Sequence, residues 1–163
     1  MSKVVLITGG SSGIGKSIGE FLTNKGFIVY GTSRNPQNYS KSKFPIIALD
    51  VTESTSILAA VNILLENEGK IDVLINNAGV GITGPIEEIP EFEIKSNFET
   101  NFFGPMNVIK AVLPKMREQR SGLIINITSI AGYMGLPYRG IYSASKAALE
   151  ILTESFRMEI KKN

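Results

Sequence analysis

The chain has 163 residues, of which 43% are apolar and 20% are charged, and its formal net charge is +2. This composition predicts an ordinary soluble globular domain with a core of its own and argues against intrinsic disorder. The sequence contains no cysteine and no histidine, which excludes disulfides and thiolate metal sites and removes the commonest metal ligand and general base. We therefore expect no metal site, and any catalysis must use other groups.

Charge and hydropathy patterning argue against further classes of protein. Lys and Arg are scattered along the sequence and form no basic stripe, so we expect no binding of nucleic acid. No run approaches the roughly 18 apolar residues of a membrane-spanning helix. The apolar run after Lys3 ends at Ile7, which is too short for a signal peptide. The expectation is a cytoplasmic protein without a membrane segment.

Short apolar runs alternate with longer helical patterns, which is typical of βα units on a parallel sheet covered on both faces. The runs predict buried strands at residues 4–7, 27–31, 46–49, 73–75 and 123–127. Helices are predicted from Gly13 to about 24, from about 52 to 68, from about 91 to 120 and from about 142 to 162. Pro105 and Pro114 predict a break or bend in the third of these. The fold class is therefore α/β, a doubly wound parallel sheet of the Rossmann type, in one domain over residues 1–163.

A glycine-rich turn, Thr8-Gly-Gly-Ser-Ser-Gly-Ile-Gly15, joins the first strand to the first helix. Gly9 permits the tight turn, Gly13 lets the backbone approach a phosphate, and Gly15 lets helix and strand pack closely. The backbone amides and the positive end of the helix would face a pyrophosphate. The alternative is a loop that only turns the chain. We expect a dinucleotide to be bound here by Gly9, Ser11, Ser12, Gly13, Ile14 and Gly15.

The glycine spacing TGxxxGxG differs from the widespread GxGxxG fingerprint, and further motifs follow it. Asn76-Asn-Ala-Gly79 ends the fourth strand, Ser129 follows the fifth, and Tyr142-Ser-Ala-Ser-Lys146 opens the last helix. Together, and in this order, these motifs resemble the short-chain dehydrogenase/reductase family over the whole chain. The resemblance implies an oxidoreductase that interconverts an alcohol and a carbonyl by hydride transfer. It also places Asn77, Ala78 and Gly79 at the cofactor.

The resemblance further implies that the chain is incomplete at its C-terminus. Members of the family continue past the last helix with another strand, a Pro-Gly segment beside the nicotinamide, a substrate-covering loop and a closing strand. The sequence has five of the six or seven strands expected of such a sheet. The strand at residues 123–127 would then be an unpaired edge, and the substrate pocket would lack a wall.

The end of the second strand indicates the choice of cofactor. Folds that prefer NAD usually carry a carboxylate there, but residues 26–49 contain no Asp or Glu, and Ser33 and Arg34 follow the strand. An arginine suits a bidentate grip on a 2′-phosphate, which favours NADP(H) over NAD(H). Arg34 could instead be a solvated loop cation.

Asp50 and Val51 lie just past the third strand. They resemble the family position that contacts the adenine ring through a hydrogen bond and an apolar wall. Asp50 could equally cap the N-terminus of the helix that follows, and both roles could coexist.

Tyr142 and Lys146 stand four residues apart, so their side chains project from one helical face and can meet over a cofactor. Exchange of a proton with a carbonyl oxygen needs an acid or base that works near neutral pH, whereas tyrosine ordinarily ionises near pH 10. A lysine ammonium about 4 Å away can stabilise a phenolate by up to about 4 kcal/mol. We therefore expect Tyr142 to exchange the substrate proton, and Lys146 to assist it and to grip the nicotinamide ribose. Both residues would thus also bind the cofactor.

Two more residues complete the candidate catalytic set. Ser129 lies at the carboxyl edge of the sheet, where its hydroxyl could hydrogen-bond the substrate oxygen, although it could also be a turn serine. By resemblance, Asn101 matches the family asparagine that bends its helix and holds a proton-relay water to the lysine. Next to Gly104-Pro105, Asn101 could instead be only a helix breaker.

These features leave two functional hypotheses. The first is an NADP-dependent oxidoreductase for an alcohol or carbonyl. The lining at residues 130–137 is apolar, so the expected substrate is apolar, of a steroid-like or retinoid-like kind. The second is a catalytically incomplete nucleotide-binding or assembly module. Apolar residues around the last helix predict burial beyond its own sheet, and hence a homodimer or homotetramer; they are Ala148, Leu149, Ile151, Leu152, Phe156 and Met158.

Overall fold

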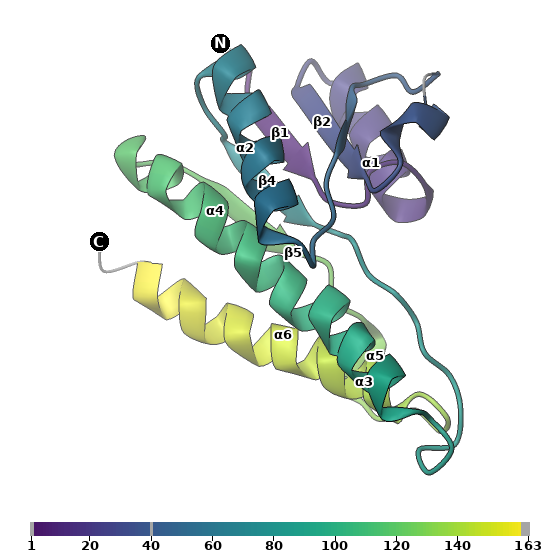
Figure 1. Cartoon of the computed structure of the whole chain (residues 1–163). Coiled ribbons are helices and arrows are strands. Elements are labelled where there is room, and N and C mark those ends of the chain that lie inside the picture. Colours follow the sequence, from purple (N-terminus) through teal and green to yellow (C-terminus); the bar gives the residue numbers. More distant parts are fainter. Residues whose placement is uncertain (1, 40, 161–163) are drawn as a thin grey trace.

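Five parallel strands form one sheet in the order β3-β2-β1-β4-β5 (Figure 1). The computed structural model describes residues 2–39 and 41–160. Because the chain moves outward from β1 to β3 and then resumes at β4 on the other side of β1, the sheet is doubly wound, as predicted. Each strand lies within two residues of its predicted position. The strands are β1 (Val4–Ile7), β2 (Ile28–Ser33), β3 (Ile46–Ala48), β4 (Val73–Asn76) and β5 (Leu123–Asn126).

Helices follow the strands and cover the sheet. The elements are α1 (Gly13–Asn24), η1 (Pro36–Tyr39), α2 (Ser54–Glu68), α3 (Glu91–Phe98), η2 (Glu99–Phe103), α4 (Gly104–Glu118), α5 (Ile130–Tyr133) and α6 (Gly140–Ile160). The last two predicted positions of the final helix, 161 and 162, lie outside the described residues. No helix within the described ranges is both long and apolar enough to cross a bilayer.

The central strand β1 supplies both halves of the core. Val4 and Leu6 point to one face, where they pack with apolar residues of α2 and α4. Val5 and Ile7 point to the other face, where they pack with Phe44 and with residues of α1. All four side chains are inaccessible to solvent. This alternation is what a strand buried on both faces requires, and it fixes the carboxyl end of β1, from which the glycine turn leaves.

The predicted break in the long helical stretch is present. It lies at η2, a π-helical turn of five residues that joins α3 to α4. Pro105 lies just after this turn, in the first turn of α4, and Pro114 lies inside that helix. Asn101 lies in the π turn itself, as its resemblance to a helix-bending asparagine predicted.

The expectation that all five strands are buried is wrong for the two edge strands, β3 and β5. In β3, Ile46 and Ile47 are only half-buried and Ala48 is exposed. Leu123 and Ile125 are 53% and 38% exposed. Within the described residues β5 pairs only with β4, and the alternate exposure shows that one face of the strand lies uncovered. The predicted unpaired edge is therefore present.

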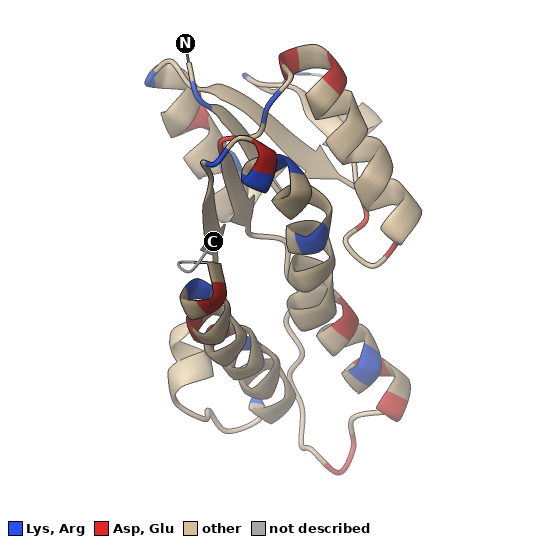
Figure 2. Ribbon diagram, turned by 90° about the vertical axis from the view of Figure 1, so that its left-hand side faces the viewer, with Lys and Arg blue, Asp and Glu red and all other residues tan. Residues whose placement is uncertain are grey.

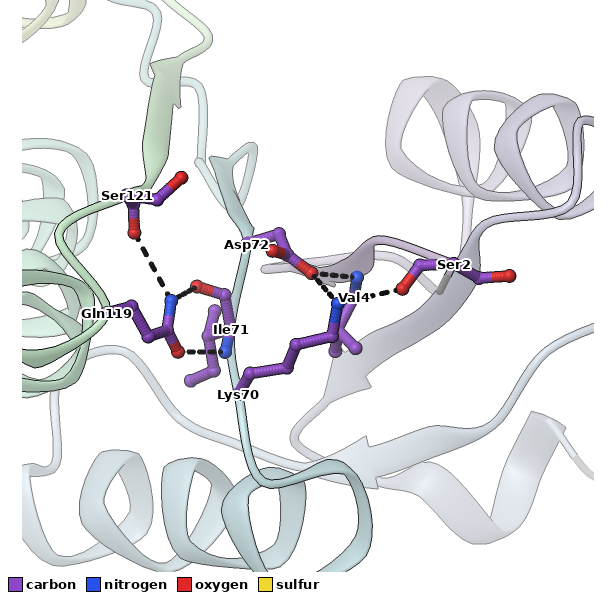
Figure 3. Close-up of polar contacts among 7 residues, drawn as sticks. All are labelled: Ser2, Val4, Lys70, Ile71, Asp72, Gln119 and Ser121. Atoms are coloured by element: carbon purple, nitrogen blue, oxygen red, sulfur yellow. Dashed lines mark hydrogen bonds and ion pairs between the residues drawn. The ribbon is translucent and has the colours of Figure 1, made fainter.

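Polar side chains join the amino ends of β1, β4 and β5 (Figure 3). Asp72 accepts a hydrogen bond from the backbone N–H of Val4 at 2.7 Å and pairs with Lys70 at 2.8 Å. Gln119, just past α4, donates to the carbonyl oxygen of Ile71 and accepts from its N–H. Gln119 also donates to the carbonyl oxygen of Ser121, before β5. These contacts hold the end of the sheet opposite to the glycine turn.

Charged side chains are spread over several elements (Figure 2). Acidic residues gather on α3 and on the loop before it, and Lys and Arg lie on several helices and loops, with Lys115 and Arg117 together in the last turn of α4. Within the described residues no group of three or more acidic side chains could hold a metal ion.

Candidate functional site

A cleft of about 480 Å³ opens at the carboxyl ends of β1, β2, β3 and β4. This is the edge at which doubly wound sheets bind ligands. Most of the predicted cofactor residues line the cleft: Gly9, Ser11, Ser12, Ser33, Arg34, Asp50, Val51, Asn77, Ala78 and Gly79. Gly13, Ile14 and Gly15 begin α1 beside it, and Tyr142 and Lys146 lie on α6.

Further residues line the cleft that the sequence did not single out: Thr32, Asn35, Asn38, Tyr39, Leu49, Thr52, Val80, Ser96 and Thr100. Thr32 and Leu49 could have been found, because they lie at the carboxyl ends of predicted strands. Asn38 and Tyr39 lie on η1, and Ser96 and Thr100 lie on α3 and η2. No local pattern marks those four, because tertiary packing brings them to the cleft.

The glycine turn has the shape that a phosphate cradle needs. Gly9 has a φ of +63°, a conformation that L side chains rarely adopt. A Cβ on Gly15 would lie only 2.5 Å from the Nδ2 of Asn77 and would also clash with the carbonyl oxygen of Gly9. Ser12 is the N-cap of α1 but makes no side-chain cap hydrogen bond, which leaves the first amides of the helix for an anion.

Asn77 and Thr8 fasten the turn to the end of β4. The Nδ2 of Asn77 donates to the carbonyl oxygens of Thr8 and Gly9, at 3.0 and 3.1 Å. In return, the Oγ1 of Thr8 accepts from the backbone N–H groups of Asn77 and Ala78, both at 3.0 Å. The amide of Asn77 therefore positions the turn, while the residue still lines the cleft.

At the far end of the cleft, Arg34 follows β2 and is exposed. Among the described residues it forms no ion pair with a carboxylate, and Ser33 and Asn35 beside it also line the cleft. The Oγ of Ser33 accepts from the N–H of Asn35 at 3.1 Å, which holds the chain after β2. This end of the cleft thus presents a cation whose charge no protein carboxylate neutralises.

Asp50 does not cap the helix that follows, so this alternative is wrong. Glu53 occupies the N-cap position of α2. The carboxylate of Asp50 instead accepts from the N–H and the hydroxyl of Thr52, at 3.0 and 2.8 Å. This local turn holds Asp50 and Val51 in the wall of the cleft.

Lys146 is buried, with 4% of its surface exposed. Its Nζ donates to the carbonyl oxygen of Ile127, past the end of β5, at 3.0 Å. Burial lowers the pKa of Lys146 below the ordinary lysine value. A Cβ on Gly79 would lie 3.3 Å from this Nζ. Because Gly79 lines the cleft, the lysine lies directly behind its wall.

Of the other predicted catalytic residues, Tyr142 lies on α6 and Ser129 directly precedes α5. Tyr142 is half-buried, and the guanidinium of Arg139 lies 5.7 Å from the centre of its ring. Ser129 caps α5, with its Oγ accepting from the N–H of Ala131 at 3.2 Å, so the turn role is real. The cap leaves the hydroxyl hydrogen free to donate. Within the described residues no hydrogen bond joins Ser129, Tyr142 and Lys146 to one another, although α5 packs on α6.

Asn101 is completely buried. Its Oδ1 accepts from the N–H of Val80 at 2.8 Å, and its Nδ2 donates to the carbonyl oxygen of Val80 at 2.9 Å and to the Oγ of Ser145 at 3.1 Å. It therefore does more than break a helix: it joins the wall of the cleft to α6.

Comparison with known proteins agrees with the fold and the motifs. The family model described as short chain dehydrogenase matches residues 3–163. A 3-ketodihydrosphingosine reductase from Bacteroides thetaiotaomicron is 49% identical over 158 residues, which cover 97% of this chain and 58% of the reductase. The chain belongs to the short-chain dehydrogenase family. It spans a little over half the length of this relative.

Solved structures of the family superpose closely on the chain. A short-chain dehydrogenase from Streptomyces avermitilis matches with a TM-score of 0.91 and 39% identity, over 99% of this chain and 61% of that one. ElxO with NADP bound matches with a TM-score of 0.90 and 32% identity, over 99% of this chain and 69% of that one.

Proposed function

We propose that the protein is an NADP(H)-dependent oxidoreductase that interconverts an alcohol and a carbonyl. The observation that carries the proposal is the continuity of one cleft. It begins at Arg34, passes the glycine turn and ends at Gly79, directly in front of the Nζ of Lys146. A dinucleotide in this cleft would extend from a cation suited to a 2′-phosphate to the helix that carries Tyr142. The NADP bound by ElxO supports the choice of cofactor.

The residues of the cleft fit such a cofactor. The space in front of the glycine turn is one that a Cβ would obstruct, the amides at the start of α1 suit a pyrophosphate, and Arg34 suits a 2′-phosphate. When bound, the cofactor supplies or accepts the hydride.

The protein's own groups would handle the proton and the substrate oxygen. Tyr142 donates a proton to the carbonyl oxygen in reduction and takes it back in oxidation. The ammonium of Lys146, held by Ile127, favours the phenolate by its charge. The free hydroxyl hydrogen of Ser129 orients the substrate oxygen.

An apolar substrate is the best supported. Large apolar side chains are exposed on and just after α5, which follows Ser129: Ile130, Tyr133, Met134, Leu136 and Tyr138. An apolar surface next to Ser129 suits a hydrophobic ketone or alcohol. The ketone in the name of the 49% identical relative, 3-ketodihydrosphingosine, is the first to test.

The test is oxidation of NADPH with this ketone and with a panel of other hydrophobic carbonyls, followed at the nicotinamide absorbance. Turnover supports the proposal, and Tyr142→Phe should lower it by at least about 100-fold because it removes the proton donor. The matched control is Tyr30→Phe, since the hydroxyl of Tyr30 donates to Glu68 and the residue does not line the cleft. NADPH binding without turnover by the wild-type protein would instead favour a nucleotide-binding module, and the absence of both would contradict both hypotheses.

We also propose that the protein forms a homodimer or homotetramer through α6. Leu149 is buried within the subunit, and Leu152 and Phe156 are half-buried, but Ile151 and Met158 remain exposed on the same helix. Burial of these apolar side chains against a second copy would stabilise an oligomer. Light scattering tests this, and a monomer at micromolar concentration would contradict it.

A further inference from the structure

Asn97 is a second buried asparagine, one helical turn before Asn101. It lies on α3 and is 2% exposed. Its Nδ2 donates to the carbonyl oxygen of Val80 at 3.0 Å, and its Oδ1 accepts from the Nδ2 of Asn101 at 3.2 Å. The carbonyl oxygen of Val80 therefore receives hydrogen bonds from both asparagines.

The N–H and the carbonyl oxygen of Val80 fix the orientation of both asparagine amides. The two hydrogens of the Asn101 Nδ2 are shared among three acceptors. The N–H of Val80 requires an oxygen from Asn101, which turns the Nδ2 of Asn101 toward Val80 O, Asn97 Oδ1 and Ser145 Oγ. Ser145 gives its own hydrogen to the carbonyl oxygen of Tyr142, so toward Asn101 it can only accept. Asn97 completes the cluster, because its Nδ2 donates to the carbonyl oxygen of Val80 and its Oδ1 accepts from the Nδ2 of Asn101. A buried polar group without such a partner costs stability, so each member fixes the others.

The cluster stands between the cleft and the catalytic helix. Val80 lines the cleft, and so do Ser96 and Thr100, the residues directly before Asn97 and Asn101. On the other side, Ser145 directly precedes Lys146. A Cβ on Gly79 would lie 3.2 Å from the Oδ1 of Asn101 and 3.3 Å from the Nζ of Lys146. The wall of the cleft and α6 therefore meet at this point.

We propose that Asn97 is a positioning residue for the reaction, whose amide holds Val80 and Asn101 so that the Gly79–Val80 wall of the cleft stays in place against Lys146. Asn97 acts through these neighbours and does not itself line the cleft. The inference rests on the proposed function, because it concerns the half of the cleft that would hold the nicotinamide end of NADP(H).

Two nucleotides separate this role from a general effect on folding. NADPH would occupy the whole cleft. Adenosine 2′,5′-bisphosphate carries only the half that Arg34 and the glycine turn would hold. In Asn97→Leu, which removes both hydrogen bonds at similar volume, the Kd for NADPH should rise about tenfold, as expected for one buried hydrogen bond. The Kd for the bisphosphate should stay within about twofold of the wild-type value. Both constants are measured by fluorescence or calorimetric titration, together with the melting temperature.

Further variants serve as controls. Asn97→Gln keeps the amide and should recover part of the NADPH affinity. Asn62→Leu, at an exposed position on α2, should change neither constant. If Asn97→Leu does not fold, Asn97→Asp keeps the size of the side chain but places a carboxylate oxygen, which repels the carbonyl oxygen of Val80, where the donor stood. The same selective loss of NADPH affinity is expected.

The proposal is overturned if Asn97→Leu, or Asn97→Asp in its place, binds NADPH as tightly as the wild type does. It is also overturned if affinity for both nucleotides falls in parallel with the melting temperature, because that describes a structural role alone. Failure of the wild-type protein to bind NADPH is a different result, and it would contradict the proposed function itself.

Discussion

The Nζ of Lys146 donates to the carbonyl oxygen of Ile127 at 3.0 Å, and this bond ties α6 to the end of β5. The ammonium is buried, and burial lowers the pKa of Lys146. A charge held in this way would favour the proton exchange proposed for Tyr142, and its burial lowers the stability of the fold.

This loss of stability should depend on pH. Below the folded pKa of Lys146 both the folded and the unfolded chain carry the proton, and burial of the charge destabilises the folded chain. As pH rises from the lowered folded pKa of Lys146 toward its ordinary value of 10.5, the folded chain loses the proton before the unfolded chain does. The destabilisation caused by the buried charge therefore decreases. Lys146→Met removes the charge altogether. Between about pH 7 and about pH 10, the free energy of unfolding of the wild type should therefore increase relative to that of Lys146→Met.

Urea denaturation of both proteins at the two pH values measures this difference. Lys110→Met, at an exposed position on α4, is the control and should show no comparable change with pH. If the difference in free energy of unfolding between wild type and Lys146→Met is the same at both pH values, the buried charge of Lys146 does not destabilise the folded chain.

Asp72 should contribute stability that disappears in acid. Burial acts to raise the pKa of Asp72, but the hydrogen bonds and charge of Lys70 and the N–H of Val4 outweigh it and hold this pKa below 3.8. The contribution is therefore complete above 3.8 and is lost as pH falls through the lower folded value. Asp72→Asn should lower the free energy of unfolding by about 1–2 kcal/mol at neutral pH.

The comparison for Asp72→Asn is Glu118→Gln, which removes an exposed ion pair with Lys115 and should cost less than about 0.5 kcal/mol. Urea denaturation at neutral pH and near about pH 3 should show the Asp72→Asn effect shrinking in acid. Equal effects of the two substitutions would mean that the contact with Val4 adds nothing.

Arg34 should decide between the two nicotinamide cofactors. Arg34→Met should raise the Kd for NADPH by roughly 10- to 100-fold, because a charge-assisted contact with the 2′-phosphate is lost. The Kd for NADH, which lacks that phosphate, should change little. Arg157→Met, at an exposed position on α6, is the control. An equal loss for both cofactors, or no loss, would support the solvated loop cation instead.

Gly15 should not tolerate a methyl group. In Gly15→Ala the added Cβ would meet the Nδ2 of Asn77 at 2.5 Å as well as the carbonyl oxygen of Gly9. We expect the free energy of unfolding to fall by roughly 1–3 kcal/mol, and NADPH binding to weaken as the turn shifts. Gly135→Ala is the matched control, since a Cβ there meets no atom within 4 Å. Thermal melting with and without NADPH distinguishes the two variants.

Sequence patterns predicted the sheet because buried parallel strands leave continuous apolar runs, and β1 to β4 have them. The same pattern misled at β5, since Leu123 and Ile125 are apolar yet exposed. Burial there depends on what covers the strand, which local sequence does not record. The break in the long helix was expected, but from the prolines. Asn101, inside the π turn at η2, forms hydrogen bonds with residues 21 and 44 positions away, and local sequence does not record such contacts.

The candidate site divides in the same way. Spaced motifs located Gly9 and Gly79, and the predicted ends of the second and third strands located Arg34 and Asp50. The structure brings these four residues to one cleft. Asn97 carried no signal, because an asparagine inside a helix is usually a solvated residue. Its importance follows only from the structure, in which its amide forms hydrogen bonds with Val80 and Asn101.

The backbone N–H groups of β5 form two sets, which point to opposite edges of the strand. The N–H groups of Leu123 and Ile127 donate to carbonyl oxygens at β4. Because successive amides of a strand point in opposite directions, those of Ile124 and Asn126 face the other edge, where no strand of the described chain lies. Hydrogen–deuterium exchange of this chain should therefore alternate along β5, with Ile124 and Asn126 taking up deuterium well before their neighbours.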